Sequence, residues 1–579
     1  MFQASQYQQQ IFQWVQSGQG HAIVAATAGA GKTTTAVKCA ALLEGQQTLF
    51  LAFNKHAAEQ LKDRLPTGCA SSTIHSLGNM ALRRALPGGK PNIKGDKLKA
   101  VAQPFVDKLL IQDADTYQCV HEGVVKLADF CRLTLTDPAA REAVRAMIER
   151  YGIELDVECE DTVLDLLPAV LAESEKQARE LGLIDFTDMI YLPTKWKLRP
   201  RGYDFVIVDE AQDLNAAQLE VVLSAVKRGG RVMAIGDRNQ AIYGWAGADH
   251  HSMDVIKERL GAVELPLSVT YRCPVSHVRL AQTVTKDILP APGAPEGVVR
   301  DVKREELHKH VAPGDLILCR VTAPLIATCY ELIAEGVNAA VRGRDIAAGL
   351  IRLIEKIMGK RADMEVFPAR LTAYRDKQTA SLRRRYDGDV DKVARALEDL
   401  DDKLEVLRIV ESKATPSTTA QFIAALNGIF DDSRPAVTLS TVHRAKGLEA
   451  DRVAILRGEL LPHPRAATPQ EMEGERCVKF VALTRAKKEL LWVLDRGQAP
   501  AEPEQPVLVE APETAQALAL DERAQLAALG WTVTYSQAEA GMWRVTVAHA
   551  AGEQCGAVHI TEAQALAALL SRLPVPATT

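Results

Sequence analysis

The 579-residue chain has no run of eighteen uncharged apolar residues, and its start, MFQASQYQQQ, lacks the basic and apolar regions of a secretory signal. Its ten cysteines include no CxxC pair and no Cys/His cluster at ligand spacing. These absences argue against a membrane-spanning helix, structural zinc and an iron–sulfur cluster. We therefore expect a cytoplasmic protein with reduced thiols and no membrane partner.

Basic residues are scarce in one part of the chain. The 69 basic and 74 acidic residues give a net charge of −5, which does not by itself indicate a nucleic-acid partner. From Gly497 to the end there are nine acidic residues, three arginines and no lysine. The tail therefore carries the whole acidic excess, and the rest of the chain is nearly neutral.

Apolar runs and helical patterns alternate in the first quarter of the chain. Strands are predicted at 21–27 and 48–53. One helix is predicted to begin at residue 31, and a second follows the second strand and ends near residue 65. This alternation is typical of a parallel sheet wrapped by helices. Strand patterns return later, which favours two sheets; these strands are predicted at 203–210, 231–237, 261–269, 314–320, 436–442 and 452–457.

The predicted fold class is α/β, with two parallel-sheet domains, two helical insertions and a small C-terminal α+β domain. A linker with four prolines precedes the small domain, which is predicted as a helix, three strands and a helix. The predicted parts are a first sheet domain (1–80 and 184–260), a helical insertion (81–183), a second sheet domain (261–348 and 432–497), a second helical insertion (349–431), the linker (498–514) and the small domain (515–579).

A glycine-rich loop follows the first predicted strand. Its sequence, ATAGAGKT, fits the P-loop pattern GxxxxGK[ST] except that Ala26 stands at the first glycine. Gly29 and Gly31 let backbone amides curl around phosphate, Lys32 reaches the β- and γ-phosphates, and the Thr33 hydroxyl binds Mg²⁺. A glycine-rich turn without nucleotide is the alternative, which the flanking strand and helix disfavour. The predicted phosphate-binding residues are Ala28, Gly29, Ala30, Gly31, Lys32, Thr33 and Thr34.

Two carboxylates end a later apolar strand, in YDFVIVDEAQD. Ligands of open α/β folds bind at the carboxyl edge of the sheet, where Asp209 and Glu210 are predicted to lie. Asp209 suits the metal, and Glu210 suits orienting and deprotonating the attacking water. A surface acidic turn is the alternative, but together with the P-loop the pair predicts nucleoside triphosphate hydrolysis.

Nine motifs occur in the order of a known family: ATAGAGKTT, AFNKHAAEQL, STIHSLG, DFTDMI, VDEAQD, IGDRNQAIYGWAGAD, LSVTYRCP, LSTVHRAKGLEADRV and VALTRAK. Over about residues 1–495 the chain resembles superfamily 1 DNA helicases of the UvrD/Rep type, particularly their shorter F-box-helicase-like members. The resemblance implies two RecA-like motor domains that use ATP and Mg²⁺ to move along single-stranded DNA.

The resemblance also implies roles for residues around the nucleotide. By it, Gln8 reads the adenine, Tyr271 stacks on the base and Glu449 holds the ribose. Gln240 resembles the γ-phosphate sensor.

Two arginines and a histidine complete the implied catalytic set. Arg272 and Arg485 resemble the paired arginines that the second sheet domain brings to the transferred phosphate, so that hydrolysis depends on domain closure. His443 resembles a residue that relays the state of Gln240 to the DNA.

Aromatic residues in the motifs are predicted to grip single-stranded DNA by stacking, which does not depend on base sequence. For each aromatic the alternative is packing in the core, and for Phe186 both interpretations stay open. Thr73 and His75 lie in a motif that contacts the backbone of the strand. The full set predicted to bind DNA is Phe53, Asn54, Thr73, His75, Phe186, Tyr243, Trp245 and His443.

The chain departs from the family pattern at two positions. Ala246 follows Trp245 where arginine is usual, and Thr270 stands where asparagine commonly precedes the Tyr-Arg pair. One DNA or phosphate contact is therefore absent or replaced. The QAIYGWAGAD form resembles the branch that moves 3′ to 5′.

Three functions follow as hypotheses. The first is an ATP-dependent 3′ to 5′ DNA helicase acting on single strands and on single/double-strand junctions. The second is a translocase that mainly strips bound proteins and unwinds weakly, which the short second insertion favours. The third is a non-catalytic scaffold, against which stand the intact Lys32, Glu210, Gln240, Arg272 and Arg485.

Two further features of the sequence are the lysine-free tail and a run of three arginines. The lysine-free tail is predicted to bind a protein rather than DNA, or else only to stabilise the motor. The absence of lysine also disfavours a nuclease centre there. The run Arg383-Arg384-Arg385 either touches duplex phosphates or forms a solvated helix face.

Overall fold

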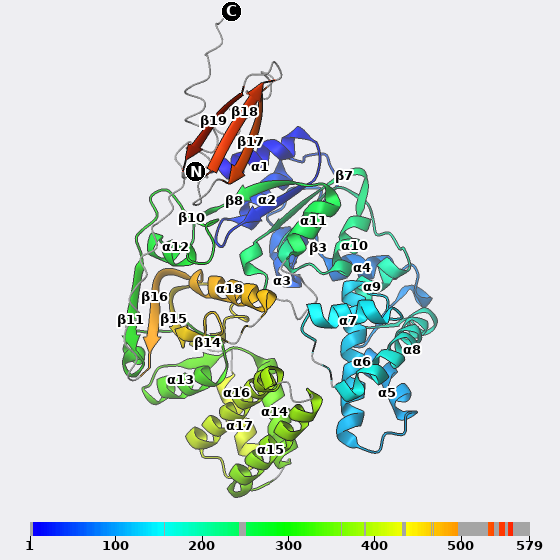
Figure 1. Cartoon of the computed structure of the whole chain (residues 1–579), viewed down its shortest axis with the longest axis vertical. Coiled ribbons are helices and arrows are strands. Elements are labelled where there is room, and N and C mark those ends of the chain that lie inside the picture. The colour runs from blue at the N-terminus through cyan, green and yellow to red at the C-terminus, as the bar shows by residue number, and fades with distance from the viewer. Residues whose placement is uncertain are drawn as a thin grey trace, which may run out of the picture. The chain divides into compact units, whose positions relative to one another are not determined.

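The computed structural model describes residues 4–153, 155, 157–242, 251–359, 362–386, 390–430, 436–464, 466, 468–495, 531–537, 543–549 and 554–559 (Figure 1). The chain divides into two compact units, Met1–Leu508 and Val509–Thr579. Tyr243, Trp245 and Ala246, the predicted linker and the two helices predicted in the tail lie outside the described residues. Within the described ranges, no helix is both long enough and apolar enough to cross a membrane.

The first sheet is parallel throughout, with strand order β3-β2-β6-β7-β1-β8. Its central runs, such as TLFLA, are buried along their whole length, as expected for strands covered on both faces. Because β8 pairs with β1, this sheet continues to Leu267, beyond the boundary predicted at residue 260. The strands are β1 (Ala22–Ala26), β2 (Thr48–Ala52), β3 (Cys69–Thr73), β6 (Tyr203–Val208), β7 (Val226–Gly236) and β8 (Val263–Leu267).

Helices alternate with these strands, as the sequence predicted. The first begins with a capping box in which the side chains of Ser5 and Gln8 bond to each other's backbone amides. The helices of this domain are α1 (Gln6–Ser17), α2 (Lys32–Ala41), α3 (Lys55–Lys62), α4 (Ile74–Leu82), α9 (Asp188–Lys195), α10 (Ala216–Ser224) and α11 (Ser252–Leu260), with short turns η2 (Ala211–Asp213) and η3 (Arg238–Gln240).

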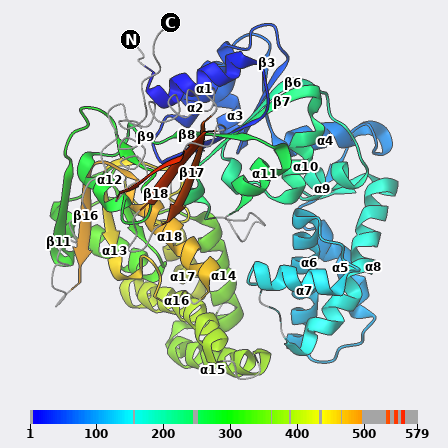
Figure 2. The same ribbon diagram turned by 45° about the horizontal axis from the view of Figure 1, so that its top comes forward.

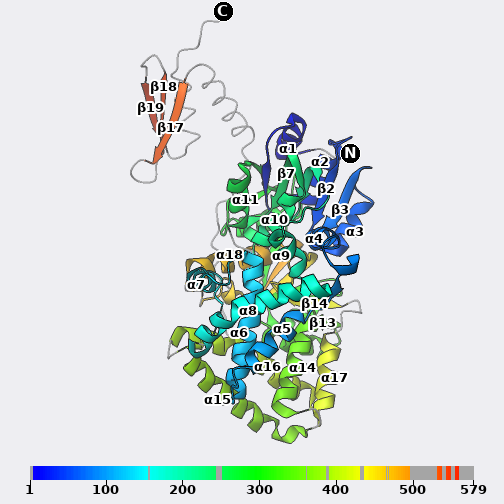
Figure 3. The ribbon, with the colours of Figure 1, turned by 90° about the vertical axis from the view of Figure 1, so that its right-hand side faces the viewer.

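The first insertion is helical, as predicted, and has its own apolar core, which includes Val124, Leu127 and Leu167. A short parallel ribbon, β4 (Asn92–Ile93) with β5 (Leu183–Ile184), joins its entry to its exit. Its elements are η1 (Pro87–Gly89), α5 (Lys97–Asp107), α6 (Ala114–Thr134), α7 (Arg141–Arg150) and α8 (Val157–Leu181), drawn in blue to cyan in Figure 3.

The second sheet is also parallel, in the order β11-β16-β15-β12-β14-β13. A two-stranded ribbon, β9 (Val269–Thr270) with β10 (Leu289–Pro290), precedes it. Its elements are α12 (Val275–Ala281), β11 (Val298–Lys303), η5 (Arg304–Lys309), β12 (Leu316–Cys319), α13 (Ala323–Ala334), β13 (Ala339–Val341), β14 (Val437–Thr441), β15 (Ala450–Leu456), η7 (Gly458–Leu460), α18 (Pro469–Leu483) and β16 (Ala486–Leu494).

The second insertion interrupts this sheet between β13 and β14 (Figure 2). Arg383 and Arg384 are exposed at the end of its second helix, which leaves both interpretations of the arginine run open. Its elements are α14 (Arg344–Met358), η6 (Met364–Val366), α15 (Phe367–Arg385), α16 (Val390–Ala414) and α17 (Thr419–Ile429).

In the C-terminal unit the described residues form one antiparallel sheet. The strands are β17 (Trp531–Gln537), β18 (Trp543–His549) and β19 (Gln554–His559), paired in that order. They confirm the three strands predicted for the tail.

Candidate nucleotide site and single-strand face

The loop between β1 and α2 has the backbone of an anion site. Gly29 and Gly31 have φ angles of 71° and 77°, in the left-handed region that glycine adopts without steric cost. Because α2 begins directly after Gly31, the unpaired amides of its first turn add to those of the loop. A Cβ on Gly29 would lie 2.5 Å from the Cβ of Arg272, so this position also requires glycine for contact with the second domain. The loop fits the phosphates of a nucleotide.

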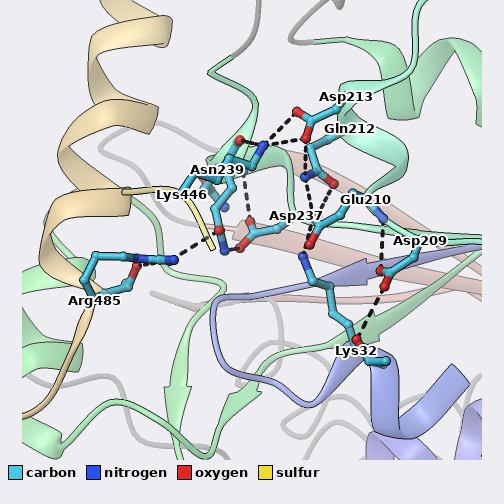
Figure 4. A network of polar contacts seen from close by, with 12 residues as sticks. Lys32, Asp209, Glu210, Gln212, Asp213, Asp237, Asn239, Lys446 and Arg485 are labelled. Carbon is cyan, nitrogen blue, oxygen red and sulfur yellow. Dashed lines mark hydrogen bonds and ion pairs between the residues drawn. The ribbon is translucent and has the colours of Figure 1, made fainter. Parts of the chain in front are cut away.

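The predicted carboxylates lie opposite this loop at the end of β6 (Figure 4). The Thr33 hydroxyl donates to Asp209 Oδ2 at 3.4 Å, so two hard oxygen donors converge where Mg²⁺ is expected. Lys32 Nζ lies 2.8 Å from Glu210 Oε2. Glu210 has a φ of 54°, a strained value for a residue with a side chain, and such strain concentrates at functional sites.

The two adjacent carboxylates have opposite pKa shifts. Burial, together with the charge of Glu210, raises the pKa of Asp209 to about 6. Burial alone would raise the pKa of Glu210 as well, but the charges of Lys32 and Lys446 outweigh it and lower the pKa to about 2. Glu210 is thus held as a carboxylate while Lys32 is its partner.

A side-chain network connects the first sheet to Arg485 of the second. Gln240 Nε2 donates to Asp237 Oδ2 at 2.6 Å, and Gln240 Oε1 accepts from Arg485 Nη2 at 3.3 Å. Arg485 is 1% exposed and makes no ion pair with any described carboxylate. Burial and the neighbouring charge of Arg272 lower its pKa to about 10. A buried guanidinium without a carboxylate is a position that favours an incoming anion.

A second link between the sheets is a buried ion pair. Lys446 Nζ lies 2.7 and 2.6 Å from the two carboxylate oxygens of Asp213, and it also donates to the carbonyl of Gln240 at 2.6 Å. Burial raises the pKa of Asp213 to about 6, against the opposing charge of Lys446. Gln212 joins this pair to the site, since its Nε2 donates to Glu210 at 2.7 Å and its Oε1 accepts from the Asp237 amide.

The residues expected around base and ribose are Gln8, Tyr271 and Glu449. Gln8 is buried and donates to Thr35 Oγ1 on α2 at 2.9 Å. Tyr271 is 53% exposed, and its backbone amide bonds to the carbonyl of Gly29. Glu449 pairs with Arg272 Nε at 2.7 Å and Lys487 Nζ at 2.6 Å. Arg272 therefore points to Glu449 in this structure rather than to the P-loop.

Of the residues predicted to bind DNA, Phe53 and Phe186 are exposed, at 51% and 61%. For Phe186, which the sequence left undecided, this exposure removes the core interpretation. Asn54 and Thr73 have defined structural roles, because they cap helices α3 and α4. The side chain of each accepts a hydrogen bond from a backbone amide in the first turn of its helix. Burial lowers the pKa of His75, on α4.

A hollow joins part of this face to the nucleotide site. Phe53, His75, Asp209, Glu210 and Asp213 are among the residues that line it. His443 lies elsewhere, after β14, where burial and the charge of Arg320 lower its pKa to about 4.

Several residues of this network received no role from the sequence. Asp213 and Gln212 stand in VDEAQD, Asp237 in IGD and Lys446 in HRAKGLE, so all lie inside motifs already recognised. The sequence motifs contain these residues, but they do not predict which residues pair. Asp213 and Lys446, for example, are 233 residues apart.

Two parallel sheets, with a P-loop and a carboxylate pair on the first and a buried arginine from the second, define a P-loop nucleotide-binding protein with a site between two domains. Residues 7–260 match the family described as the UvrD/REP helicase N-terminal domain. Over these residues the chain is similar to helicases of the UvrD/Rep type.

Three curated relatives are similar to parts of this chain. A probable DNA helicase II homolog of Mycoplasma pneumoniae is 25% identical over 49% of this chain and 42% of its own length. The ATP-dependent DNA helicase Rep of Escherichia coli is 26% identical over 46% of this chain and 40% of its own length. The ATP-dependent DNA helicase PcrA of Bacillus subtilis is 23% identical over 82% of this chain and 81% of its own length. The chain therefore spans less than half the length of the first two relatives.

Proposed function

We propose that the protein is an ATP-dependent DNA helicase that translocates 3′ to 5′ on single-stranded DNA and unwinds duplex. The observation that carries the proposal is the contact of Arg485 with Gln240 beside the P-loop, at 3.3 Å. Because the arginine belongs to the second sheet, it takes part only when the two sheets are together. Hydrolysis is thereby tied to a domain movement, which a translocase requires.

The geometry and the resemblance together support the following catalytic roles. The P-loop amides and Lys32 hold the phosphates, while Thr33 and Asp209 would hold Mg²⁺, which neutralises phosphate charge when bound. Glu210 orients a water and accepts its proton after Lys32 has turned from the carboxylate to the phosphates. Gln240, Arg272 and Arg485 stabilise the charge of the transition state, for which Arg272 has to leave Glu449.

Binding of nucleotide and binding of DNA are coupled through the hollow between Phe53, His75 and the carboxylates. The elements that carry Phe53 and His75 follow neighbouring strands of the same sheet as Asp209, so a change at the carboxylates reaches them directly. Stacking on exposed aromatics supplies a grip that no base sequence limits. The 3′ to 5′ direction rests on the QAIYGWAGAD form.

The test is DNA-stimulated ATPase activity followed by unwinding of duplexes that carry only a 3′ or only a 5′ overhang. Stimulation by single strands and unwinding from the 3′ overhang alone support the proposal. Unwinding only from the 5′ overhang overturns the direction, and ATPase activity indifferent to DNA overturns the motor.

The second insertion favours a second candidate function. It contains only four α-helices within the described residues of 344–429, which suits a translocase that strips bound proteins and unwinds weakly. Displacement of a recombinase filament without strand separation, measured side by side, would select this alternative.

The tail is proposed to bind a protein partner. Its lack of lysine makes attraction to a DNA backbone poor. Truncation after Arg496 should leave ATPase and unwinding rates near normal. Loss of single-strand affinity in the folded, truncated protein would assign the tail to the DNA path instead.

A further inference from the structure

One stretch that runs from the first sheet domain into the first insertion contains basic residues but no acidic ones. Between Asp63 and Asp96 the sequence has no Asp or Glu, although acidic residues make up about one residue in eight of the whole chain (74 of 579). The stretch also contains Thr73 and His75, already predicted to contact DNA. Its five basic side chains are all exposed, and none makes an ion pair with another described residue; they are Arg64, Arg83, Arg84, Lys90 and Lys94.

The end of this stretch lies beside Phe186. The Lys94 amide donates to the carbonyl of Ile184 at 2.8 Å, which continues the β4–β5 ribbon. A Cβ on Gly95 would lie 4.0 Å from the ring of Phe186. Both residues of β4 are exposed, and Ile93 is 43% exposed despite its apolar side chain. Lys94, Ile93 and Phe186 therefore share one edge of the domain.

Buried charges beneath this edge fix the two turns to each other. Lys97, whose amide donates to the carbonyl of Lys94, bonds through Nζ to Asp188 at 2.7 Å and to the carbonyl of Ser174 at 2.8 Å. Arg132 lies 2.9 Å from Asp188 and 2.8 Å from Asp185, and these two aspartates also accept from each other's amides. We call Lys97, Arg132, Asp185 and Asp188 the anchor cluster.

The anchor cluster explains how an exposed ring is held in place. Phe186 lies between Asp185 and Asp188, so both ends of its turn are tied to buried cations of the insertion. Replacing a buried ion pair by apolar residues is often neutral for stability, so geometry is the better-supported reason for such a cluster. The ring and the basic turn are thus presented together and pre-organised.

We propose that Lys90 and Lys94 contact phosphates of the single strand whose bases meet Phe186, which makes the β4–β5 ribbon a further DNA-binding element. An exposed aromatic next to unpaired lysines is the combination by which proteins follow a single strand without reading its sequence. The acids nearest in sequence to the ribbon are Asp185, which is buried and paired with Arg132, and the exposed Asp96 and Glu180. The inference rests on the proposed function and extends its DNA path to the entry of the first insertion.

The test is the salt dependence of oligo(dT) binding by the full chain carrying Lys90→Gln and Lys94→Gln. Each phosphate contact on a single strand contributes about 0.7 to the slope of log affinity against log salt, so the slope should fall by about 1.4. Affinity at low salt should fall roughly tenfold. If Lys90 and Lys94 had only a structural role, the slope of log affinity against log salt would not change in the variant.

The matched control carries Lys286→Gln and Lys309→Gln, two exposed lysines of the second domain. It removes the same charge and should leave the slope nearer to wild type than the ribbon variant does. Unfolding temperature and ATPase activity without DNA should be unchanged in the ribbon variant, because both of its side chains are exposed.

A wild-type slope in the ribbon variant overturns the inference. So does a loss confined to blunt duplex, which would place the duplex rather than the single strand on the ribbon. If wild-type protein itself shows neither single-strand binding nor DNA-stimulated ATPase activity, the proposed function fails instead, and the two failures are thereby distinguished.

Discussion

The nucleotide site and the anchor cluster are both buried groups of charged residues, but they are completed differently. In the anchor cluster both cations, Lys97 and Arg132 of the first insertion, lie within 2.9 Å of carboxylates just after it, in the first sheet domain. In the nucleotide site, Arg485 is buried without a described carboxylate partner and comes from the other sheet. A cluster whose cations are all paired with carboxylates fixes a position, whereas an incomplete cluster between the two sheet domains is ready to bind an anion and to respond to it.

The same contrast explains the pKa shifts. Lys32 and Lys446 hold Glu210 ionised with a pKa of about 2, while Asp209 and Asp213 have pKa values raised to about 6 by burial. Under the proposed function, Lys32 exchanges its carboxylate partner for phosphate when the nucleotide binds. The comparison can therefore be tested by removing individual charges.

The largest effect is expected at the P-loop and its carboxylate. Glu210→Gln should lower kcat by about 10²–10⁴-fold and leave nucleotide binding nearly intact, because it removes only the base. The Lys32→Ala variant should lose both ATP turnover and nucleotide binding, since it removes a cation from the phosphates. ATP turnover and nucleotide affinity are measured, with Lys38→Ala on the same helix as the control. Wild-type hydrolysis by either variant would contradict the assignment of Lys32 and Glu210 to the catalytic site.

The next effect concerns the pair that joins the two sheets. Lys446→Met leaves Asp213 buried and unpaired, which should lower the free energy of unfolding by about 3–5 kcal/mol. Adding Asp213→Leu should restore most of the stability in denaturant titrations but not the DNA stimulation of ATPase activity. Full recovery of both properties would show that the pair is only structural, like the anchor cluster.

A smaller effect is expected at the stacking residues. Phe186→Ala and Trp245→Ala should each weaken single-strand binding by roughly 1–3 kcal/mol, about tenfold or more, with basal nucleotide binding unchanged. Fluorescence anisotropy with labelled oligonucleotides measures the affinity. A variant that melts at a markedly lower temperature and keeps its DNA affinity would have lost a core residue instead.

The smallest effect is a pH dependence. The folded protein lowers the pKa of His443 from 6.5 to about 4, so between these values the unfolded chain binds more protons than the folded one. Stability should therefore decline as the pH falls from 6.5 towards 4. His443→Asn should flatten this part of the profile when unfolding is followed at pH 7, 5.5 and 4.5. An unchanged slope would contradict the assigned pKa.

Most central strands were predicted, although β16 was missed, and of the edge strands only β8 was predicted. The apolar runs that became β1, β2, β6 and β12 are buried almost throughout, so their sequences carry the signal. The strands CASST and VVRDVK lie at the edges of the two sheets as β3 and β11, and most of their side chains are only partly buried. Edge strands need little apolar sequence, and periodicity therefore did not reveal these two.

The sequence by itself determined the P-loop, the Asp209–Glu210 pair and the alternation of strands and helices, because these depend on neighbours along the chain. Only the tertiary structure decided that Phe186 is exposed, that Lys446 pairs with Asp213, and that Lys97 reaches Asp188. The two ion pairs join residues that are 91 and 233 positions apart in the sequence. A charge pattern in one segment cannot specify which distant segment will neutralise it, since that choice is made by the packing of the domains.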